Sequence, residues 1–282
     1  MSNLKTVVIA AVVVAGIALL PGVSSARAAL PAPSAAIPRE PERLAHTLAV
    51  TSRDLDAAID RWREGNTAVG RPPRDVELLA LYHQRIYRLL RVQDRLAARV
   101  FRLLPSGLAR EARLIVGAGK ALRGITPPLK APTIRTKRPQ PLGVLMSHYR
   151  AAERRFRVPW RVLAAINFSE SAFGKIRTDS ASGAQGPMQF MPATWRAYGL
   201  GGNVHDDRDA IRGAANYLRQ SGAPGNLRRA LYAYNHSTAY VDSILRYATL
   251  IERDVRNLYA FYSWQLFVRT TKGDVRLTGP GR

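Results

Sequence analysis

The chain has 282 residues, of which 46% are hydrophobic, and it contains no cysteine. This length and composition suffice for one large or two small domains, and the lack of cysteine excludes a disulfide framework, a thiol nucleophile and a lipid-modified cysteine. The formal net charge of +23 implies an anionic partner: nucleic acid, a membrane surface or a wall polymer.

The five histidines are scattered and show no metal-ligand spacing such as H-E-x-x-H. They stand at His46, His83, His148, His205 and His236. We therefore expect no metal site and no cofactor. No helix-turn-helix, zinc finger or basic-aromatic sheet motif accompanies the positive charge, so nucleic acid is not the expected partner.

Residues 1–29 have the features of a signal peptide. Lys5 supplies the positive start, residues 7–20 are apolar, and Ala26-Arg27-Ala28 offers a cleavage site. The apolar run is short for a membrane span, which favours a cleaved signal over an uncleaved tether. We expect a secreted protein, or one tethered with its bulk outside the cytoplasm. Residues 30–41, rich in Pro and Ala, are predicted to be a disordered leader.

Residues 42–123 are predicted to form a helical hairpin or small bundle. One apolar stripe runs from Leu44 to Trp62, a second from Leu79 to Leu103 within one longer helix that begins near Asp75, and a third, weaker helix covers residues 108–122. Interleaved arginines form either a face directed at wall polymer or membrane, or a solvated face opposite the core. This half carries no evident chemistry.

Residues 124–141 contain several prolines and basic side chains and no acid. Such a segment builds no helix and predicts a semi-extended spacer between two modules. The second module is expected at residues 142–262. After it, residues 263–282 change to a strand pattern around Lys272-Gly273, which predicts a β-hairpin.

Glu170 is the acid that stands out in the second module. Pro159 precedes a helical pattern in which Leu163, Ile166 and Glu170 fall at i, i+3 and i+7, so the carboxylate lies on the stripe that faces the core. Desolvation there raises the pKa of a carboxyl and keeps a proton available near neutral pH. A structural acid at a helix end is the alternative explanation.

A glycine-rich loop follows this helix. Gly183, Gly186 and Pro187 interrupt helical structure, and apolar residues flank Gln189, whose amide can bind a polar ligand. Pro192 begins another helix. Helix, acid, bent loop and aromatic helix together favour a walled cleft. The Asp206-Asp207-Arg208-Asp209 cluster is best explained as a cap at a helix start.

Three ordered motifs in this half resemble those of lytic transglycosylases, lysozyme-like enzymes that cut peptidoglycan glycan strands, and most of all secreted actinobacterial members. The motifs are Glu170-Ser171-Ala172-Phe173, then Gly186 to Pro192 with Thr194-Trp195, then Ala233-Tyr234-Asn235. One departure is His236-Ser237, where members of the family often carry a small residue and Gly. The resemblance implies a mainly α, lysozyme-like catalytic domain with a C-terminal β-hairpin, preceded by the N-terminal helical hairpin or bundle.

The resemblance also implies the chemistry. Glu170 would protonate the oxygen that leaves N-acetylmuramic acid and then, as a base, take the proton of the sugar's 6-hydroxyl, which leaves a 1,6-anhydro end. Gln189 and the backbone of Gly186 and Met188 would bind the sugar. Ser171 would hydrogen-bond near the acid, and Tyr234 and Asn235 would shape the adjoining subsite, whereas Tyr232 and Tyr240 are expected to be core aromatics.

Two other functions stay open from the sequence. A lysozyme-type hydrolase would need a second carboxylate, with Asp179 or the cluster from Asp206 to Asp209 as candidates. A non-catalytic wall-binding protein would use the basic helical half alone. In each case the expected partners are peptidoglycan strands and other anionic wall or membrane surfaces, and the sequence indicates no protein partner.

Overall fold

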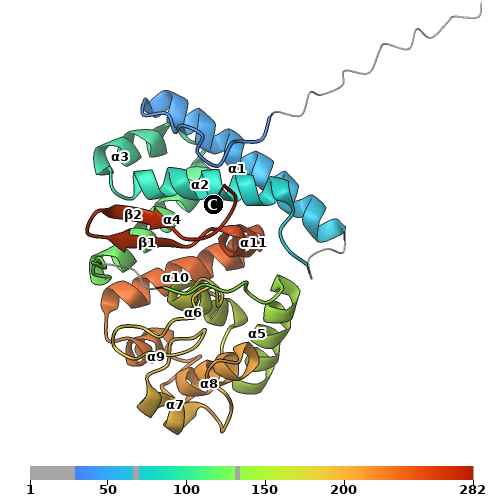
Figure 1. Cartoon of the computed structure of the whole chain (residues 1–282), viewed down its shortest axis with the longest axis vertical. Helices are drawn as coiled ribbons and strands as arrows, with labels where there is room; N and C mark the ends of the chain where they lie inside the picture. The colour runs from blue at the N-terminus through green and yellow to red at the C-terminus, as the bar shows by residue number, and fades with distance from the viewer. Residues whose placement is uncertain (1–28, 66–69, 131–133, 282) are drawn as a thin grey trace, which may run out of the picture.

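The computed structural model describes residues 29–65, 70–130 and 134–281. The predicted signal peptide lies outside these ranges except for its last residue. The first half contains four helices among the described residues: α1 (Pro41–Glu64), α2 (Arg74–Leu90), α3 (Asp94–Leu103) and α4 (Ser106–Ile125). In Figure 1 they occupy one end of the molecule, with α4 reaching towards the middle.

The apolar stripes predicted for this half are mostly buried, but Leu103, at the end of the second stripe, is 50% exposed. Leu44, Leu48 and Ile59 of α1 have no exposed surface, and Trp62 is 1% exposed. The prediction of a single long helix that begins near Asp75 is wrong, because the chain turns at residues 91–93 and continues as α3. The turn allows α3 to pack against α1, so tertiary packing overrides a helical pattern that is locally continuous.

The leader at residues 30–41 also differs from the expectation of disorder. The hydroxyl of Tyr82 donates to the carbonyl of Ala36 at 2.7 Å, and the guanidinium of Arg85 donates to the carbonyls of Pro33 and Ala35 at 3.1 and 2.8 Å. Ile37 packs against the core. These contacts with α2 give the described residues of the leader a fixed path, which composition alone does not indicate.

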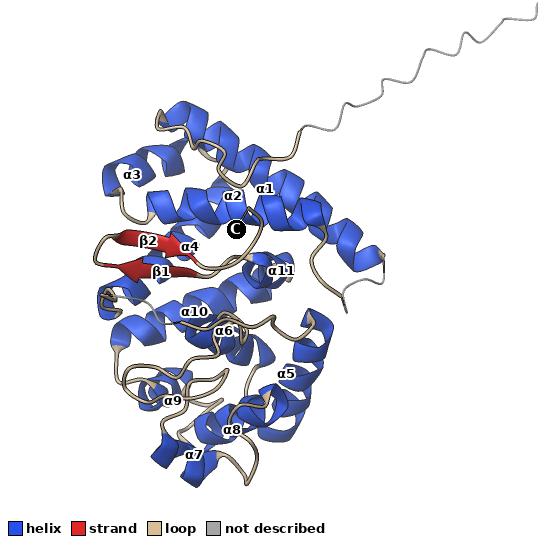
Figure 2. Ribbon diagram, in the orientation of Figure 1, coloured by secondary structure: helices blue, strands red, loops and turns tan. Residues whose placement is uncertain are grey.

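The second half is also mainly helical, as Figure 2 shows. Its helices are α5 (Leu142–Phe156), α6 (Trp160–Ser171), α7 (Pro192–Tyr198), α8 (Asp207–Gln220), α9 (Leu227–Tyr234), α10 (Thr238–Arg253) and α11 (Arg256–Ser263). The predicted hairpin is confirmed: β1 (Phe267–Thr270) pairs antiparallel with β2 (Gly273–Arg276), with Thr270 opposite Gly273.

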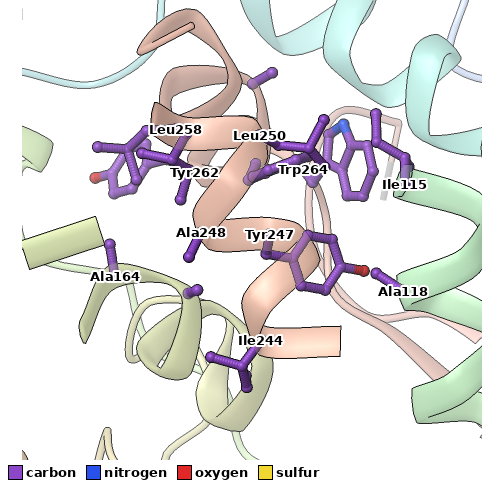
Figure 3. Packing of buried hydrophobic residues seen from close by; sticks show 14 of the residues in the cluster. Ile115, Ala118, Ala164, Ile244, Tyr247, Ala248, Leu250, Leu258, Tyr262 and Trp264 are labelled. Carbon is purple, nitrogen blue, oxygen red and sulfur yellow. The ribbon is translucent and has the colours of Figure 1, made fainter. Parts of the chain in front are cut away.

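The two halves are not independent modules joined by a spacer. A single cluster of buried apolar side chains extends through both, and α4 packs along α10. Figure 3 shows Ile115 and Ala118 of α4 on one side of α10 and Ala164 of α6 on the other. The hydroxyl of Ser243 on α10 donates to the carbonyl of Ala118 at 3.0 Å. The first half therefore contributes directly to the core beside α6.

The segment predicted as a spacer pairs with both neighbours. Leu129 forms a parallel bridge with Thr270 of β1, and Thr136 forms an antiparallel bridge with Ile176 after α6. These backbone hydrogen bonds hold an extended, proline-rich stretch against the fold, where its own sequence forms no regular element. In the described part of the chain, no helix is long and apolar enough to cross a membrane.

Candidate active site

Glu170 lies in the last turn of α6, on the same side of the helix as Leu163 and Ile166, which are completely buried. Its own side chain is half-buried. The hydroxyl of Tyr240, in the first turn of α10, donates a hydrogen bond to Oε1 of Glu170 at 2.6 Å. Ser237 caps α10 by accepting from the backbone N–H of Tyr240 at 3.3 Å, so the cap of α10 fixes where this phenol stands.

Burial controls the protonation of Glu170. Desolvation raises the pKa of its carboxyl from 4.5 to about 7, and the hydrogen bond from Tyr240 opposes this by lowering the pKa. Among the described residues, no charged side chain contributes to the shift. A carboxyl with this pKa exists in both forms near neutral pH and can serve first as a proton donor and then as an acceptor.

The glycine-rich loop after α6 folds back on itself. Gln185 and Phe190 exchange two backbone hydrogen bonds of 2.9 Å. Gly186 has a φ of +72° and Gln189 a φ of +50°, and the side-chain amide of Gln189 donates to the carbonyl of Gly186 at 2.9 Å. A Cβ on Gly186 would stand 1.9 Å from the carbonyl oxygen of Val204. Only glycine fits this position without displacing the backbone.

Buried polar groups hold this loop under the end of α6. The hydroxyl of Ser171 donates to the carbonyl of Pro187 at 2.6 Å and accepts from the N–H of Gly174 at 2.8 Å. Asn167 donates to the same carbonyl at 3.1 Å and lies 3.2 Å from the sulfur of Met188. Ser171 and Met188 have no exposed surface. Both side chains therefore position the loop beside Glu170, and the predicted contact between sugar and the backbone of Met188 stays a prediction.

Tyr234 connects the loop to the tyrosine beside Glu170. Its hydroxyl donates to the carbonyl of Met188 at 2.7 Å, and its ring lies nearly parallel to that of Tyr240, with 6.4 Å between centroids. The hydroxyl therefore holds the loop rather than the carboxyl. Asn235 ends α9 and is half-buried. Its backbone N–H donates to the carbonyl of Leu231 at 3.0 Å.

Comparison with known proteins shows what this part of the chain is similar to. Residues 147–253 match the family model of the transglycosylase SLT domain. The match includes Glu170, the loop, Tyr234 and Tyr240. The lysozyme-like, mainly helical fold class expected from the sequence is confirmed, with its C-terminal hairpin.

Three curated relatives match parts of the chain. A membrane-bound lytic murein transglycosylase F of Thiobacillus denitrificans is 30% identical over 120 residues, covering 40% of this chain and 25% of that protein. A transglycosylase of Enterobacteria phage PRD1 is 37% identical over 89 residues, 31% of this chain and 33% of that protein. A membrane-bound lytic murein transglycosylase F of Pseudomonas fluorescens is 28% identical over 109 residues, covering 36% and 22%. The chain thus spans a third or less of their lengths. No solved structure matches it.

The acids considered as second carboxylates have structural partners, and Asp179 accepts from the side-chain amide of Gln185 at 3.3 Å. Asp206 accepts from the backbone N–H of Asp209 at 3.0 Å and caps α8, and Asp209 accepts from the N–H of Asn203 at 3.1 Å. Asp207 is 3% exposed and lies 3.9 Å from the ammonium of Lys137. The interpretation of this cluster as a helix cap agrees with the geometry. In the described ranges, no group of three or more His, Asp or Glu could hold a metal ion.

Sequence reasoning missed two residues of this site. Tyr240 is buried, as expected of a core aromatic, but its contact with Glu170 was not predicted. The same expectation is wrong for Tyr232, which is 45% exposed. Asn167 is completely buried between the hydroxyl of Tyr149 and the loop, at distances of 3.0 and 3.1 Å. The sequence does contain an indication for Asn167, which is an amide in an apolar helix three residues before Glu170. A buried amide requires hydrogen-bond partners, so its position could have suggested a contact with a neighbouring segment.

Replacing Tyr240 by Phe is expected to move the pH dependence of activity. In the parent protein, the hydrogen bond from Tyr240 lowers the pKa of Glu170. Without this bond, the pKa should rise above about 7. Since a proton donor must be protonated, activity in the variant should persist to higher pH by about one unit, while its maximum falls about tenfold. Initial rates of wall lysis against pH measure both effects. Tyr232→Phe, which removes a hydroxyl from an exposed ring, should leave the profile unchanged.

Proposed function

We propose that this chain is a peptidoglycan lytic transglycosylase that acts in cell-wall remodelling. It cleaves the β-1,4 bond between N-acetylmuramic acid and N-acetylglucosamine and leaves a 1,6-anhydromuramic end. The observation that carries the proposal is Glu170, a carboxyl with a pKa of about 7 that accepts a hydrogen bond from Tyr240 inside the region that matches the transglycosylase model. The names of the relatives support transglycosylase activity, and that of the Thiobacillus denitrificans protein supports murein as the substrate.

The reaction uses one carboxyl twice. In its protonated form, Glu170 donates to the glycosidic oxygen as the bond to the anomeric carbon breaks, and the substrate's acetamido group stabilises the positive charge that develops there. The carboxylate then removes the proton of the 6-hydroxyl, whose oxygen closes on the anomeric carbon. The proton returns to Glu170, and no water is consumed. Tyr240 keeps the carboxyl in place through both proton transfers.

The contacts of the other candidate acids favour this route over hydrolysis by two carboxylates. In that alternative a second Asp or Glu lies about 5–10 Å from the acid. Asp179, one candidate for that role, accepts from the side-chain amide of Gln185 at 3.3 Å. Asp206 caps α8 and Asp209 accepts from the backbone N–H of Asn203. A lysozyme-type hydrolase is therefore the second candidate.

Substrate contacts are proposed for groups that the fold leaves open. The side chain of Gln189 donates to Gly186, and within the described residues its carbonyl oxygen accepts no hydrogen bond, so it can accept from a sugar hydroxyl or acetamido N–H. Asn235 presents a half-buried amide after α9. Glycan subsites commonly combine such amides with apolar walls. Here the half-buried Trp195 can supply one, and its ring packs against that of buried Phe190 at 5.1 Å.

The proposed site of action is outside the cytoplasm, at the wall. The net charge of +23 suits a surface that meets anionic wall polymers or membrane headgroups. The signal-like residues 1–29 and the resemblance to secreted actinobacterial members support secretion or tethering.

Mass spectrometry of products from purified peptidoglycan tests the proposed reaction. We expect muropeptides with 1,6-anhydromuramic ends, each 18 mass units lighter than its hydrolysed counterpart because no water is added. Reducing ends would show a lysozyme-type hydrolase and contradict the lytic route. A protein that binds sacculi and releases nothing would be a wall-binding protein, the third function open from the sequence.

A further inference from the structure

A cavity of about 240 Å³ lies where the two halves of the chain meet. Its walls come from α2, α4, the end of α6, α10 and the β-hairpin. Ser169 and Ala172, which flank Glu170 and Ser171 in the chain, line it. Figure 3 shows two of its aromatic side chains, Tyr247 and Trp264, between α10 and α4. The proposed reaction does not use this cavity.

The charge around the cavity is strongly positive. Among its described lining residues, four are arginines and one is a carboxylate: Arg88, Arg91, Arg123, Arg269 and Asp274. Asp274 pairs with Arg88, lies 3.3 Å from the guanidinium of Arg123 and 3.9 Å from that of Arg91. One carboxylate thus serves three guanidinium groups. Burial and the neighbouring arginines lower the pKa of Arg88 to about 10, as expected where positive charge is in excess.

Several hydrogen-bond donors at this cavity have no partner. Within the described residues, no acceptor reaches the hydroxyl of Tyr87, the indole N–H of Trp264, the hydroxyl of Ser169 or Nε of Arg91, and each of these atoms is buried. Tyr87 and Trp264 are 3% and 7% exposed. Buried donors are nearly always paired in folded proteins, so four at one cavity point to a ligand that accepts hydrogen bonds.

The backbone of α4 leaves room for one of these donors. A Cβ on Gly119 would stand 2.9 Å from Cδ of Arg91 and 3.3 Å from its Nη1. The missing side chain therefore lets Arg91 lie flat against the helix with its guanidinium at the cavity. Arg269 is fixed on the opposite wall, where it donates to the carbonyls of Arg123 and Thr126 at 3.2 and 3.3 Å.

We propose that this cavity binds the phosphate group of a small phosphate ester. Phosphate offers acceptor oxygens in several directions and carries the charge that offsets the arginines, which bind it in planar, bidentate geometry. The cavity is larger than one phosphate ion, and Phe168, Tyr247 and Leu122 give it apolar walls, which suits a carbon skeleton beside the phosphate. The ligand would touch α2, α4, the hairpin and α6 together.

Calorimetric titration of the full chain tests this site. The probes are sn-glycerol 3-phosphate, inorganic phosphate and, as a carboxylate control, acetate, all at matched ionic strength. We expect saturable 1:1 binding of the ester and none of acetate. Binding of inorganic phosphate with equal affinity would assign the site to free phosphate, and tighter binding of the ester would assign it to an ester. Failure of both phosphates to bind would overturn the proposal.

Two arginine variants separate a built site from general charge attraction. Arg91→Met removes a cavity guanidinium and keeps most of the side chain's length, and it should weaken phosphate binding about ten- to a hundredfold. Arg95→Met makes the same change in net charge at an exposed position of α3 and should leave binding unchanged. Equal weakening by both variants would show attraction to the basic surface alone and contradict the site.

Tyr87→Phe provides a test that does not depend on charge. Without ligand, the variant should unfold at the same temperature as the parent or higher, because it removes a buried hydroxyl that has no partner. With saturating ester, the parent should gain more thermal stability than the variant. An equal gain in both proteins would mean that this hydroxyl never meets the ligand and would overturn the assignment of the donors.

Discussion

Glu170→Gln is expected to abolish most wall lysis while the protein stays folded. The amide keeps the shape of the side chain, and its oxygen can still accept the hydrogen bond that Tyr240 donates at 2.6 Å. It can neither give up a proton to the leaving oxygen nor take one from the 6-hydroxyl. Loss of a single acid–base group costs about 10²- to 10⁴-fold in rate, and here the same group serves both steps.

Turbidity loss of purified peptidoglycan suspensions measures this effect. Glu252→Gln is a matched control, because it removes a carboxylate that lies 55% exposed at 2.7 Å from Arg161 on the surface. Such a pair contributes about 1 kcal/mol or less, so this variant should lyse like the parent. Lysis by Glu170→Gln at near-parental rate would refute the assignment of the acid.

The same substitution should change stability in a direction set by pH. The pKa of Glu170 is raised from 4.5 to about 7 in the folded chain, so ionisation of this buried group opposes folding. The cost is absent below the unfolded pKa, grows between 4.5 and about 7, and is complete above. Glutamine has no such cost. Denaturant titrations should therefore show Glu170→Gln more stable than the parent at alkaline pH, on the order of 2–3 kcal/mol at most, and not at acid pH.

Features that depend on neighbouring residues in the chain could be predicted from the sequence. The spacing of Leu163, Ile166 and Glu170 placed the carboxyl on the buried side of α6, where the structure has it. The change of period near Lys272-Gly273 predicted the C-terminal hairpin. In both cases the local pattern contains the geometry, because side chains three or four residues apart share a helix face and alternate residues share a strand face.

Features decided by distant contacts could not be predicted this way. Tyr240 reaches Glu170 across 70 residues of sequence, and no local pattern distinguishes it from Tyr232, which is exposed. The position of the loop also depends on contacts between distant residues, since the sulfur of Met188 lies against Asn167 in the core. The helical period continues through residues 91–93, yet the packing of α3 on α1 ends the helix there.

The organisation into modules failed for a related reason. Residues 30–41 and 124–141 have compositions typical of disorder or of a spacer, because Pro and Ala form few packing contacts by themselves. Their order comes from other segments: Tyr82 and Arg85 bind the carbonyls of the first, and Thr270 and Ile176 pair with the second. Composition describes what a segment can stabilise alone, and these two are stabilised by the surfaces they cross.

Gly186→Ala is expected to destabilise the loop beside Glu170 more than a glycine-to-alanine substitution elsewhere in that loop. A residue with a side chain pays about 1–2 kcal/mol for the left-handed backbone, and Gly186 has a φ of +72°. The added Cβ would also stand 1.9 Å from the carbonyl oxygen of Val204, a backbone atom that cannot rotate away. Overpacking of this kind adds about 1–3 kcal/mol, so the total loss of stability should be about 2–5 kcal/mol.

Gly183→Ala separates the two contributions. Gly183 has a φ of +86°, and a Cβ there meets nothing within 4 Å, so this variant should pay the backbone cost alone. The difference between the two variants in denaturant titrations measures the contact with Val204. Activity should fall more in Gly186→Ala than in Gly183→Ala. The carbonyl of Gly186 accepts a hydrogen bond from the side-chain amide of Gln189 at 2.9 Å, so displacing Gly186 also moves the side chain of Gln189. Equal losses of stability in both variants would mean that the loop shifts to accommodate the added Cβ of Gly186→Ala. That result would contradict the prediction that the carbonyl of Val204 constrains this position.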